Sequence, residues 1–167
     1  AITAGASGDI NPIYGPGTDF REIEAVGYHV GKTAWERFGE IRTFPVESLE
    51  ALNQTLVLPG KKQVEDHFPR EVYEPGPDVE ISLSAFRIGH LVLAGISGEL
   101  MNEIGAAIKE QSPYSNTVIM THCNGSSGYI CTDKAFSEGG YEIMVTRLMP
   151  GAEGAVSSEL LQMISSL

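Results

Sequence analysis

Two consecutive apolar segments constrain the fold of this chain more than any other feature. Residues 80–86 alternate, with Ile81, Leu83 and Ala85 separated by polar residues, which predicts a strand with one buried face. Residues 91–96 follow after a short turn and form an almost continuous apolar run. A strand of that composition is usually covered on both faces. The two segments together predict a sheet with helices packed against it.

Helical and extended patterns also occur along the rest of the chain. Apolar residues recur at helical spacing from about residue 20 to residue 38, and Thr18 or Asp19 can cap that helix. The order of the elements predicts an α/β fold, with α+β as the alternative: a mixed sheet flanked by helices. The other expected elements are helices over 98–111 and 152–167, strands over 49–58, 117–121 and 141–148, and a proline-bearing surface loop or lid over 60–78.

Composition limits the classes of partner. The chain has 167 residues, of which 42% are hydrophobic, which is enough for one domain with a sizeable core. Its net charge of −11 argues against a nucleic-acid backbone or an anionic membrane surface as a nonspecific partner. We therefore expect no nucleic-acid partner. No apolar run approaches the ~18 residues of a membrane span.

The cysteines and histidines form none of the common metal motifs. Cys123 and Cys131 lack CxxC spacing, and the alternatives for them are one disulfide bridge or two buried reduced thiols, which we favour. The four histidines show neither HxH nor HExxH spacing, so a complete zinc site of the usual kinds is absent from the sequence. His122 differs from the others because it ends a predicted strand just before a glycine-rich turn.

Two oxygen-bearing side chains are candidates for one site. Glu99 follows the apolar strand where a helical pattern begins, and a carboxylate at such a junction points off the end of a sheet, where metals and polar substrates often bind. The glycine-rich turn before Tyr129 could bring its phenol to the same place. Each residue also has a purely structural alternative. Glu99 could be present only because a negative charge is favourable at a helix N-terminus, and Tyr129 could only pack against neighbouring side chains.

Three short blocks, in this order and spacing, resemble the C-terminal half of the catalytic domain of the neutral (non-lysosomal) ceramidase family, including its bacterial members. The first is Gly8-Asp9-Ile10-Asn11-Pro12. The second is Gly98-Glu99 at the expected start of a helix. The third is Tyr129-Ile-Cys-Thr132, followed by Gly140-Tyr141-Glu142 with twelve residues between the tyrosines.

The resemblance implies a zinc-dependent amide hydrolase that acts on N-acylsphingosine or a related N-acyl lipid, with a zinc-bound water as nucleophile. In the family, two histidines, a glutamate and a tyrosine hold the zinc, and Glu99 and Tyr129 match the last two. Tyr141 matches an active-site tyrosine that hydrogen-bonds the substrate, and Asp9 matches an active-site aspartate. Asn11 stands where the family has serine, so it could donate a hydrogen bond but could not act as an acyl-accepting nucleophile.

The resemblance also implies that this chain is part of a longer protein. None of its four histidines lies at a matching position, so the histidine ligands are expected upstream, in an N-terminal half or a second copy that associates with this chain. A periplasmic or secreted location is implied by the family. Two alternatives stay open: a catalytically degenerate homologue that acts as a binding or interaction protein, and an unrelated α/β domain.

Overall fold

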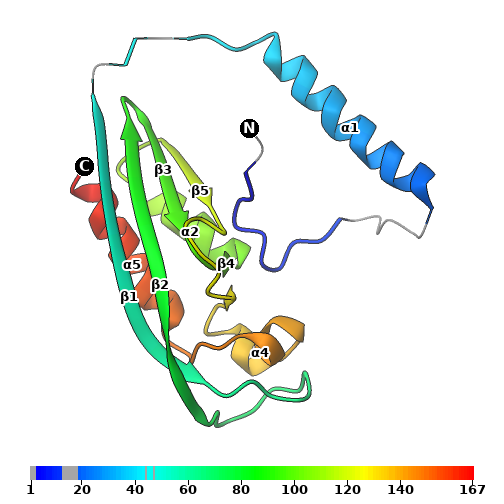
Figure 1. Cartoon of the computed structure of the whole chain (residues 1–167), viewed down its shortest axis with the longest axis vertical. Coiled ribbons are helices and arrows are strands. Elements are labelled where there is room, and N and C mark those ends of the chain that lie inside the picture. The colour runs from blue at the N-terminus through cyan, green and yellow to red at the C-terminus, as the bar shows by residue number, and fades with distance from the viewer. Residues whose placement is uncertain (1–2, 13–18, 44, 47) are drawn as a thin grey trace. The chain divides into compact units, whose positions relative to one another are not determined.

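The structure is a computed structural model that describes residues 3–12, 19–43, 45–46 and 48–167 (Figure 1). The chain forms two compact units, one from residues 1–10 and 47–167 and the other from Asn11–Val46. The elements in chain order are α1 (Phe20–Phe38), β1 (Leu49–Lys61), β2 (Pro75–Ile88), β3 (Leu91–Ile96), β4 (Glu99–Leu100), α2 (Asn102–Gln111), β5 (Asn116–Met120), β6 (Tyr129–Ile130), α3 (Ala135–Glu138), α4 (Tyr141–Val145) and α5 (Ala152–Ser165).

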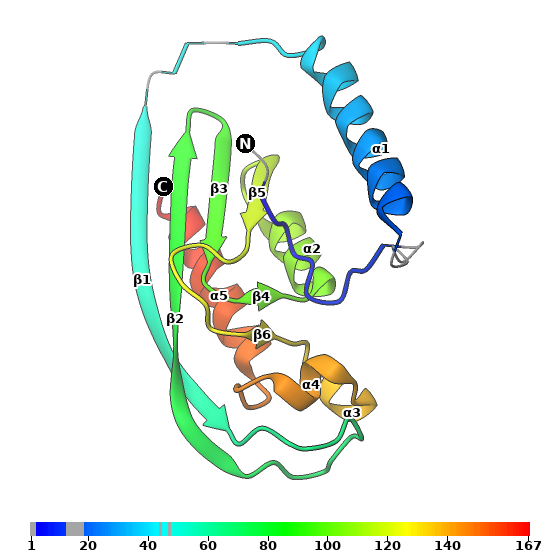
Figure 2. The same cartoon turned by 45° about the vertical axis from the view of Figure 1, so that its right-hand side comes forward.

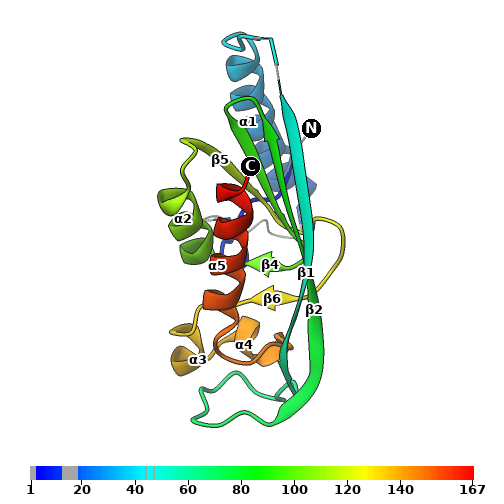
Figure 3. The same cartoon turned by 90° about the vertical axis from the view of Figure 1, so that its left-hand side faces the viewer.

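The larger unit is built on a four-stranded mixed sheet in the order β1-β2-β3-β5. β1, β2 and β3 pair antiparallel, and β3 pairs parallel with β5 through the α2 crossover. Helices α2 and α5 lie against one face of this sheet, as Figure 3 shows. The expected mixed sheet with flanking helices is therefore confirmed. β1 and β2 reach further than predicted, so the connecting loop narrows from 60–78 to residues 62–74.

The core forms where the apolar patterns of the sequence meet. Leu83 of β2 pairs with Ile96 of β3, and both side chains are fully buried on the helix-covered face. Helix α5 supplies Val156, Leu160 and Ile164 at helical spacing from the other side. Apolar side chains buried on this scale are the main favourable contribution to folding. This core fixes the end of β3, after which the candidate site begins.

A second sheet consists of two short parallel strands beyond the end of β3. Glu99 pairs with Tyr129 and Leu100 with Ile130, and Figure 2 shows β4 and β6 side by side. Glu99 N–H donates to the carbonyl of Gly128 at 2.9 Å. This pairing corrects the prediction of a helix over 98–111, because the chain stays extended through Leu100 and α2 begins only at Asn102.

The segment 141–148 was predicted to be a strand, and this was wrong for its first part. Tyr141–Val145 forms the short helix α4. Gly139 and Gly140 both have positive φ, which lets the chain turn sharply into the helix, and Met144 N–H donates to the Gly140 carbonyl at 3.0 Å. The chain then extends, and Leu148 forms an isolated bridge with Gly60.

Both cysteines are free, so the thiol alternative is confirmed. Cys131 is buried and Cys123 is half-buried. Burial raises the pKa of the Cys131 thiol to about 12, with the negative charge of Glu142 as the next cause. Cys131 is therefore a protonated core residue at neutral pH.

The smaller unit contains helix α1, as the apolar spacing predicted. Asp19 accepts a hydrogen bond from the backbone N–H of Arg21 at 2.9 Å and so caps the helix. The other predicted cap, Thr18, lies outside the described residues. No residue of α1 is buried.

Candidate functional site

Glu99 and Tyr129 lie side by side on β4 and β6. The parallel register pairs them directly, and the Glu99 carboxylate is close enough to raise the pKa of the Tyr129 phenol. The Glu99 side chain is 27% exposed, so it is reachable from solvent but held by its neighbours. The two candidates taken from the sequence therefore meet at one place, although through strand pairing and not at a helix start.

The electrostatics of this pair favour a cation. Burial raises the pKa of the Tyr129 phenol, and the negative charges of the Glu99 and Glu142 carboxylates raise it further. A carboxylate and a phenol oxygen thus share a site where a second negative charge is unfavourable. A divalent cation between them would offset that repulsion and favour the phenolate. The donor set fits a metal with oxygen ligands, and zinc accepts such ligands.

Tyr141 adjoins the pair from helix α4. Its ring meets the Tyr129 ring edge-on, with centroids 6.2 Å apart and an interplanar angle of 82°. The residue is 58% exposed, so the ring packs on Tyr129 while much of its surface faces solvent. Thr146, just after α4, donates its hydroxyl to the Tyr129 carbonyl at 2.8 Å. These contacts hold α4 against β6 and keep Tyr141 beside the pair.

Asp9 lies against the start of α2. Its Oδ1 accepts a hydrogen bond from the backbone N–H of Asn102 at 2.7 Å. Gly8 brings it there by donating to the Leu100 carbonyl at 2.8 Å, and a Cβ on Gly8 would lie only 3.0 Å from the Glu99 carbonyl oxygen. Asp9 therefore satisfies an otherwise unpaired N–H at the helix N-terminus. This structural role was not foreseen from the sequence.

Asn11 belongs to the smaller unit. The structure brings Glu99, Tyr129 and Tyr141 together and places Asp9 beside β4, but it does not place Asn11 relative to them.

His122 is a site residue that sequence reasoning marked only weakly. Its Nε2 lies 3.9 Å from Oε2 of Glu99, and its side chain is 50% exposed. The signal in the sequence was its place at the end of a strand before the Asn124 turn. The backbone N–H of His122 donates to the Gly98 carbonyl at 3.2 Å, a contact between distant segments that no local pattern reveals.

Two buried serines tie the site to the main sheet. The hydroxyls of Ser97 and Ser127 are 2.6 Å apart. Ser97 Oγ also accepts from the backbone N–H of Ser82 at 2.9 Å, and Ser127 donates to the Glu80 carbonyl at 2.8 Å. These bonds fix the segment that leads to Tyr129.

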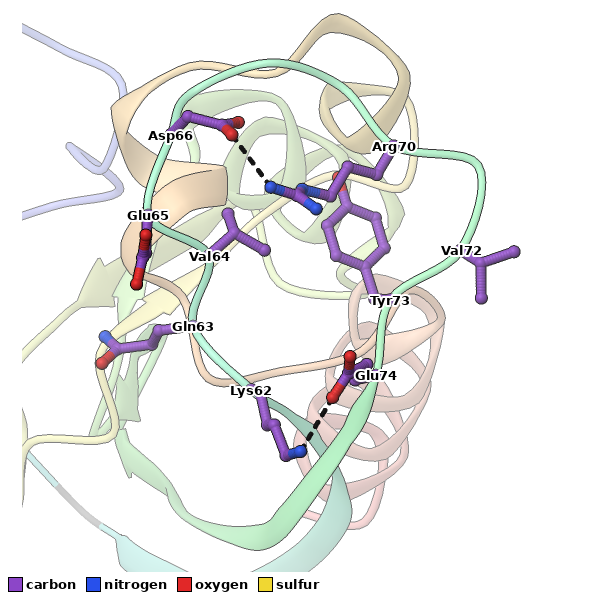
Figure 4. A pocket seen from close by; sticks show the side chains of 9 residues that line it. All are labelled: Lys62, Gln63, Val64, Glu65, Asp66, Arg70, Val72, Tyr73 and Glu74. Atoms are coloured by element: carbon purple, nitrogen blue, oxygen red, sulfur yellow. Dashed lines mark hydrogen bonds and ion pairs between the residues drawn. The ribbon is translucent and has the colours of Figure 1, made fainter.

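A cavity of about 330 Å³ lies in the loop that joins β1 and β2, away from these residues (Figure 4). Two ion pairs cross it, Lys62 with Glu74 at 2.7 Å and Arg70 with Asp66 at 2.9 Å. All four side chains are well exposed, so each pair contributes little stability. None of the candidate site residues lines this cavity.

Two absences apply to the described part of the chain. It contains no group of three or more His, Cys, Asp and Glu side chains able to hold a metal ion. Within the same residues, no helix has the length and apolar character needed to cross a membrane.

Comparisons with known proteins give a fold-level match. The neutral ceramidase from Pseudomonas aeruginosa superimposes with a TM-score of 0.69 at 16% identity, over 95% of this chain and 34% of that one. A structure titled "Ceramidase complexed with C2" matches with a TM-score of 0.49 at 21% identity, over 52% of this chain and 15% of that one. No family model and no curated protein matches the sequence. The chain therefore has a ceramidase-like fold and spans about a third of the length of the Pseudomonas neutral ceramidase.

Proposed function

We propose that this chain is part of a zinc-dependent amide hydrolase that cleaves N-acylsphingosine or a related N-acyl lipid. The observation that carries the proposal is the direct pairing of Glu99 with Tyr129 on adjacent strands. The ceramidase-like fold supports the same class of reaction.

Glu99 and Tyr129 would hold the zinc ion. Both present oxygen donors, and the pKa of Tyr129 is raised first by burial and next by the negative charge of Glu99. Zinc, when bound, lowers the pKa of a coordinated water to about 7 and polarises a substrate carbonyl. Further ligands, the two histidines implied by the family resemblance, would come from the rest of the longer protein.

Tyr141 would stabilise the charge that develops on the substrate oxygen. Its exposed phenol stands next to Tyr129 and can donate a hydrogen bond to the amide carbonyl as it becomes an oxyanion. A positioned donor of this kind contributes roughly 10²–10³-fold to such reactions. Asp9 would accept or orient a proton with the carboxylate oxygen that does not cap α2.

The test is carried out on the longer protein that contains this chain. Glu99→Gln should lower both the zinc content and the rate of N-acyl hydrolysis, the latter by at least about 100-fold. Glu103→Gln is the matched control, because this exposed glutamate lies four residues away on α2 and outside the site. Zinc content and rate are measured on the same preparations. Unchanged zinc in Glu99→Gln would remove this residue from the metal site.

A second candidate function rests on Asn11. If asparagine at this position prevents turnover, the protein binds an N-acyl ligand or a protein partner without cleaving it. Asn11→Ser distinguishes the two proposals. A gain of hydrolysis in an otherwise inactive protein favours the binding protein, whereas wild-type hydrolysis together with stoichiometric zinc excludes it.

A further inference from the structure

We propose that the face of the four-stranded sheet opposite α2 and α5 is a docking surface, and that it receives an uncharged, apolar layer formed by another part of the longer protein. The inference rests on the proposal that this chain is part of a longer protein. It goes beyond that proposal by naming the surface that the remainder covers, which is separate from the β4–β6 pair.

Rows of side chains cross all four strands on this face. In the described part of the larger unit, the helices lie on one side of the sheet only (Figure 3). The side chains that alternate with the core residues of β2, such as Leu83, point to the other side. The strand register sorts them into three rows: Leu49-Ile88-Leu91-Asn116, Ala51-Phe86-Leu93-Val118 and Asn53-Ser84-Gly95-Met120. We call the first two rows the open face.

The three rows contain no charged residue. Charged residues make up 20% of the chain, and that share would give about two among these twelve positions. Glu50 and Arg87 of the same strands occupy the alternate positions, where they form an ion pair with each other. An antiparallel sheet that faces water usually carries polar residues on its outer side. Exposure to water therefore does not account for the composition of the open face.

The open face is nevertheless accessible in this chain. Leu49 at the β1 edge is 63% exposed and Val118 at the β5 edge is 40% exposed, while Phe86 and Leu93 between them are half-buried. The strands β3 and β5 form a parallel pair, and parallel strands are almost always covered on both faces. A contiguous apolar surface of this kind marks an interaction site.

The chain covers only the polar third row by itself. Cys123 lies over that row, because a Cβ at Gly95 would stand 2.7 Å from its Sγ. Asn124 Nδ2 donates to Ser84 Oγ at 3.0 Å, and Ser84 Oγ donates to Asn53 Oδ1 at 2.8 Å. These hydrogen bonds satisfy the polar row within the chain. The two apolar rows are the part of this face that is left for a partner.

The fold match and the charge favour the rest of the longer protein as the partner. The Pseudomonas neutral ceramidase superimposes on 95% of this chain, but the match uses only 34% of that chain. About two-thirds of that protein therefore lies outside the matched region, which is enough to form a further layer on a sheet. A second copy of this chain is disfavoured, because each copy would bring a net charge of −11 to the contact.

The experiment is cysteine labelling of the longer protein that contains this chain. Val118→Cys and Leu49→Cys place a thiol at the two edges of the open face, and Ala51→Cys replaces either variant if it does not fold. Val72→Cys is the matched control, because Val72 is 81% exposed in the loop between β1 and β2. Peptide mass spectrometry after timed maleimide treatment reads each position separately from the natural cysteines. Both face positions should react at least about 100-fold more slowly than position 72, because a covered residue reacts only when the structure opens locally.

The outcomes separate this inference from its alternatives and from the proposed function. Slow labelling at both positions in a monomer, unchanged on dilution by about 100-fold, supports the inference. Rapid labelling at either position shows a face exposed to water and overturns it. Protection that disappears on dilution, together with a dimer, assigns the face to a second copy and also overturns it. Labelling requires neither zinc nor turnover, so rapid labelling in a protein whose Glu99→Gln variant loses zinc counts against this inference alone. Protection at both positions with unchanged zinc in Glu99→Gln counts against the proposed metal role alone.

Discussion

Helix α1 and the sheet of the larger unit are held by different kinds of interaction. The helix buries none of its residues, and its features are local: the Asp19 cap, the Lys32–Glu36 pair and the stacked rings of Trp35 and Phe38. The sheet buries complete side chains such as Ile96, contributed by strands and helices far apart in sequence. Apolar residues recur at helical spacing in both α1 and α5, yet only α5 buries them, so the same pattern occurs in two environments.

The difference shows what the candidate site depends on. Glu99 follows directly from the buried end of β3, and Tyr129 is fixed by strand pairing and by the buried hydroxyls of Ser97 and Ser127. Their geometry is therefore a property of tertiary packing. Changes in the sheet should disturb the site and global stability together, whereas changes in α1 should alter only the helix.

The largest effect should come from the core next to the site. Ile96→Ala removes a fully buried side chain, and we expect the free energy of unfolding to fall by about 2–5 kcal/mol. Chemical denaturation followed by circular dichroism measures it. Ile23→Ala is the same change on α1, where the side chain is 53% exposed, and it should cost less than about 0.5 kcal/mol. Equal losses at the two positions would refute the contrast.

A smaller effect is expected from adding one methyl group at the site. A Cβ at Gly98 would lie 2.6 Å from Cδ1 of Ile130 and 3.0 Å from the Gly128 carbonyl oxygen, so Gly98→Ala should cost about 1–3 kcal/mol. Gly27→Ala on α1 meets nothing within 4 Å and should instead stabilise its helix by about 0.5–1 kcal/mol. Denaturation midpoints and helix content test both. A stable Gly98→Ala chain would mean that β4 and β6 can separate at little cost.

The two capping aspartates offer a closer comparison. Asp9→Ala should lower global stability by about 1 kcal/mol, because Asp9 anchors the N-terminal segment to α2. Asp9→Asn, which can still accept the hydrogen bond, should restore most of the loss. Thermal unfolding of both variants gives the measurement. Equal losses in the two would show that the charge, and not the hydrogen bond, stabilises the helix.

Asp19→Ala should reduce the helix content of α1 and leave the unfolding of the sheet unchanged. Hydrogen bonds from Arg21 hold the pKa of the Asp19 carboxyl below its usual range. Because this pKa is lowered in the folded state, ionised Asp19 stabilises the helix at pH values above the usual aspartate pKa of about 3.9. The contribution is lost as the pH falls through the lower, folded-state pKa. Circular dichroism between pH 5 and pH 2, as an approximate range, should show this loss in the wild type and not in Asp19→Ala.

The smallest effect belongs to the surface ion pair of α1. Nζ of Lys32 is 3.8 Å from Oε1 of Glu36, and both side chains are more than half exposed. Lys32→Ala should change helix stability by less than about 0.5 kcal/mol, and the difference should vanish in high salt. Helix content measured at low and high ionic strength tests this. A difference that persists in high salt would indicate a contact beyond charge.

The sequence predicts the elements whose signal is local and apolar. Alternation identified β2, the continuous run identified β3, and helical spacing identified α1 and α5. The start of α2 was misplaced because the partner of Glu99 is the Gly128 carbonyl, which local patterns cannot reveal. The β-like composition of residues 141–145 predicts a strand, but the turn at Gly139 and Gly140 outweighs that preference and starts a helix.

The candidate site was predictable only in part for the same reason. Glu99 and Tyr129 were singled out by their positions next to apolar and glycine-rich segments and by the resemblance. Their direct pairing, the nearness of His122 to Glu99 and the capping role of Asp9 are all contacts between segments distant in sequence. Such contacts follow from packing, which residue spacing alone does not encode.

The segment 122–128 is closed at both ends, because His122 N–H donates to the Gly98 carbonyl and the Gly128 carbonyl accepts from Glu99 N–H. The geometry of the site therefore depends on the length of this segment more than on the identity of its residues. Because successive side chains of a strand point to opposite faces, a shift of one residue in β6 would turn Tyr129 away from Glu99 and present Ile130 in its place. Divergent relatives could exchange most residues of this segment yet tolerate few insertions or deletions between His122 and Tyr129. A search for distant relatives should therefore weight the interval between these positions above the identity of the residues within it.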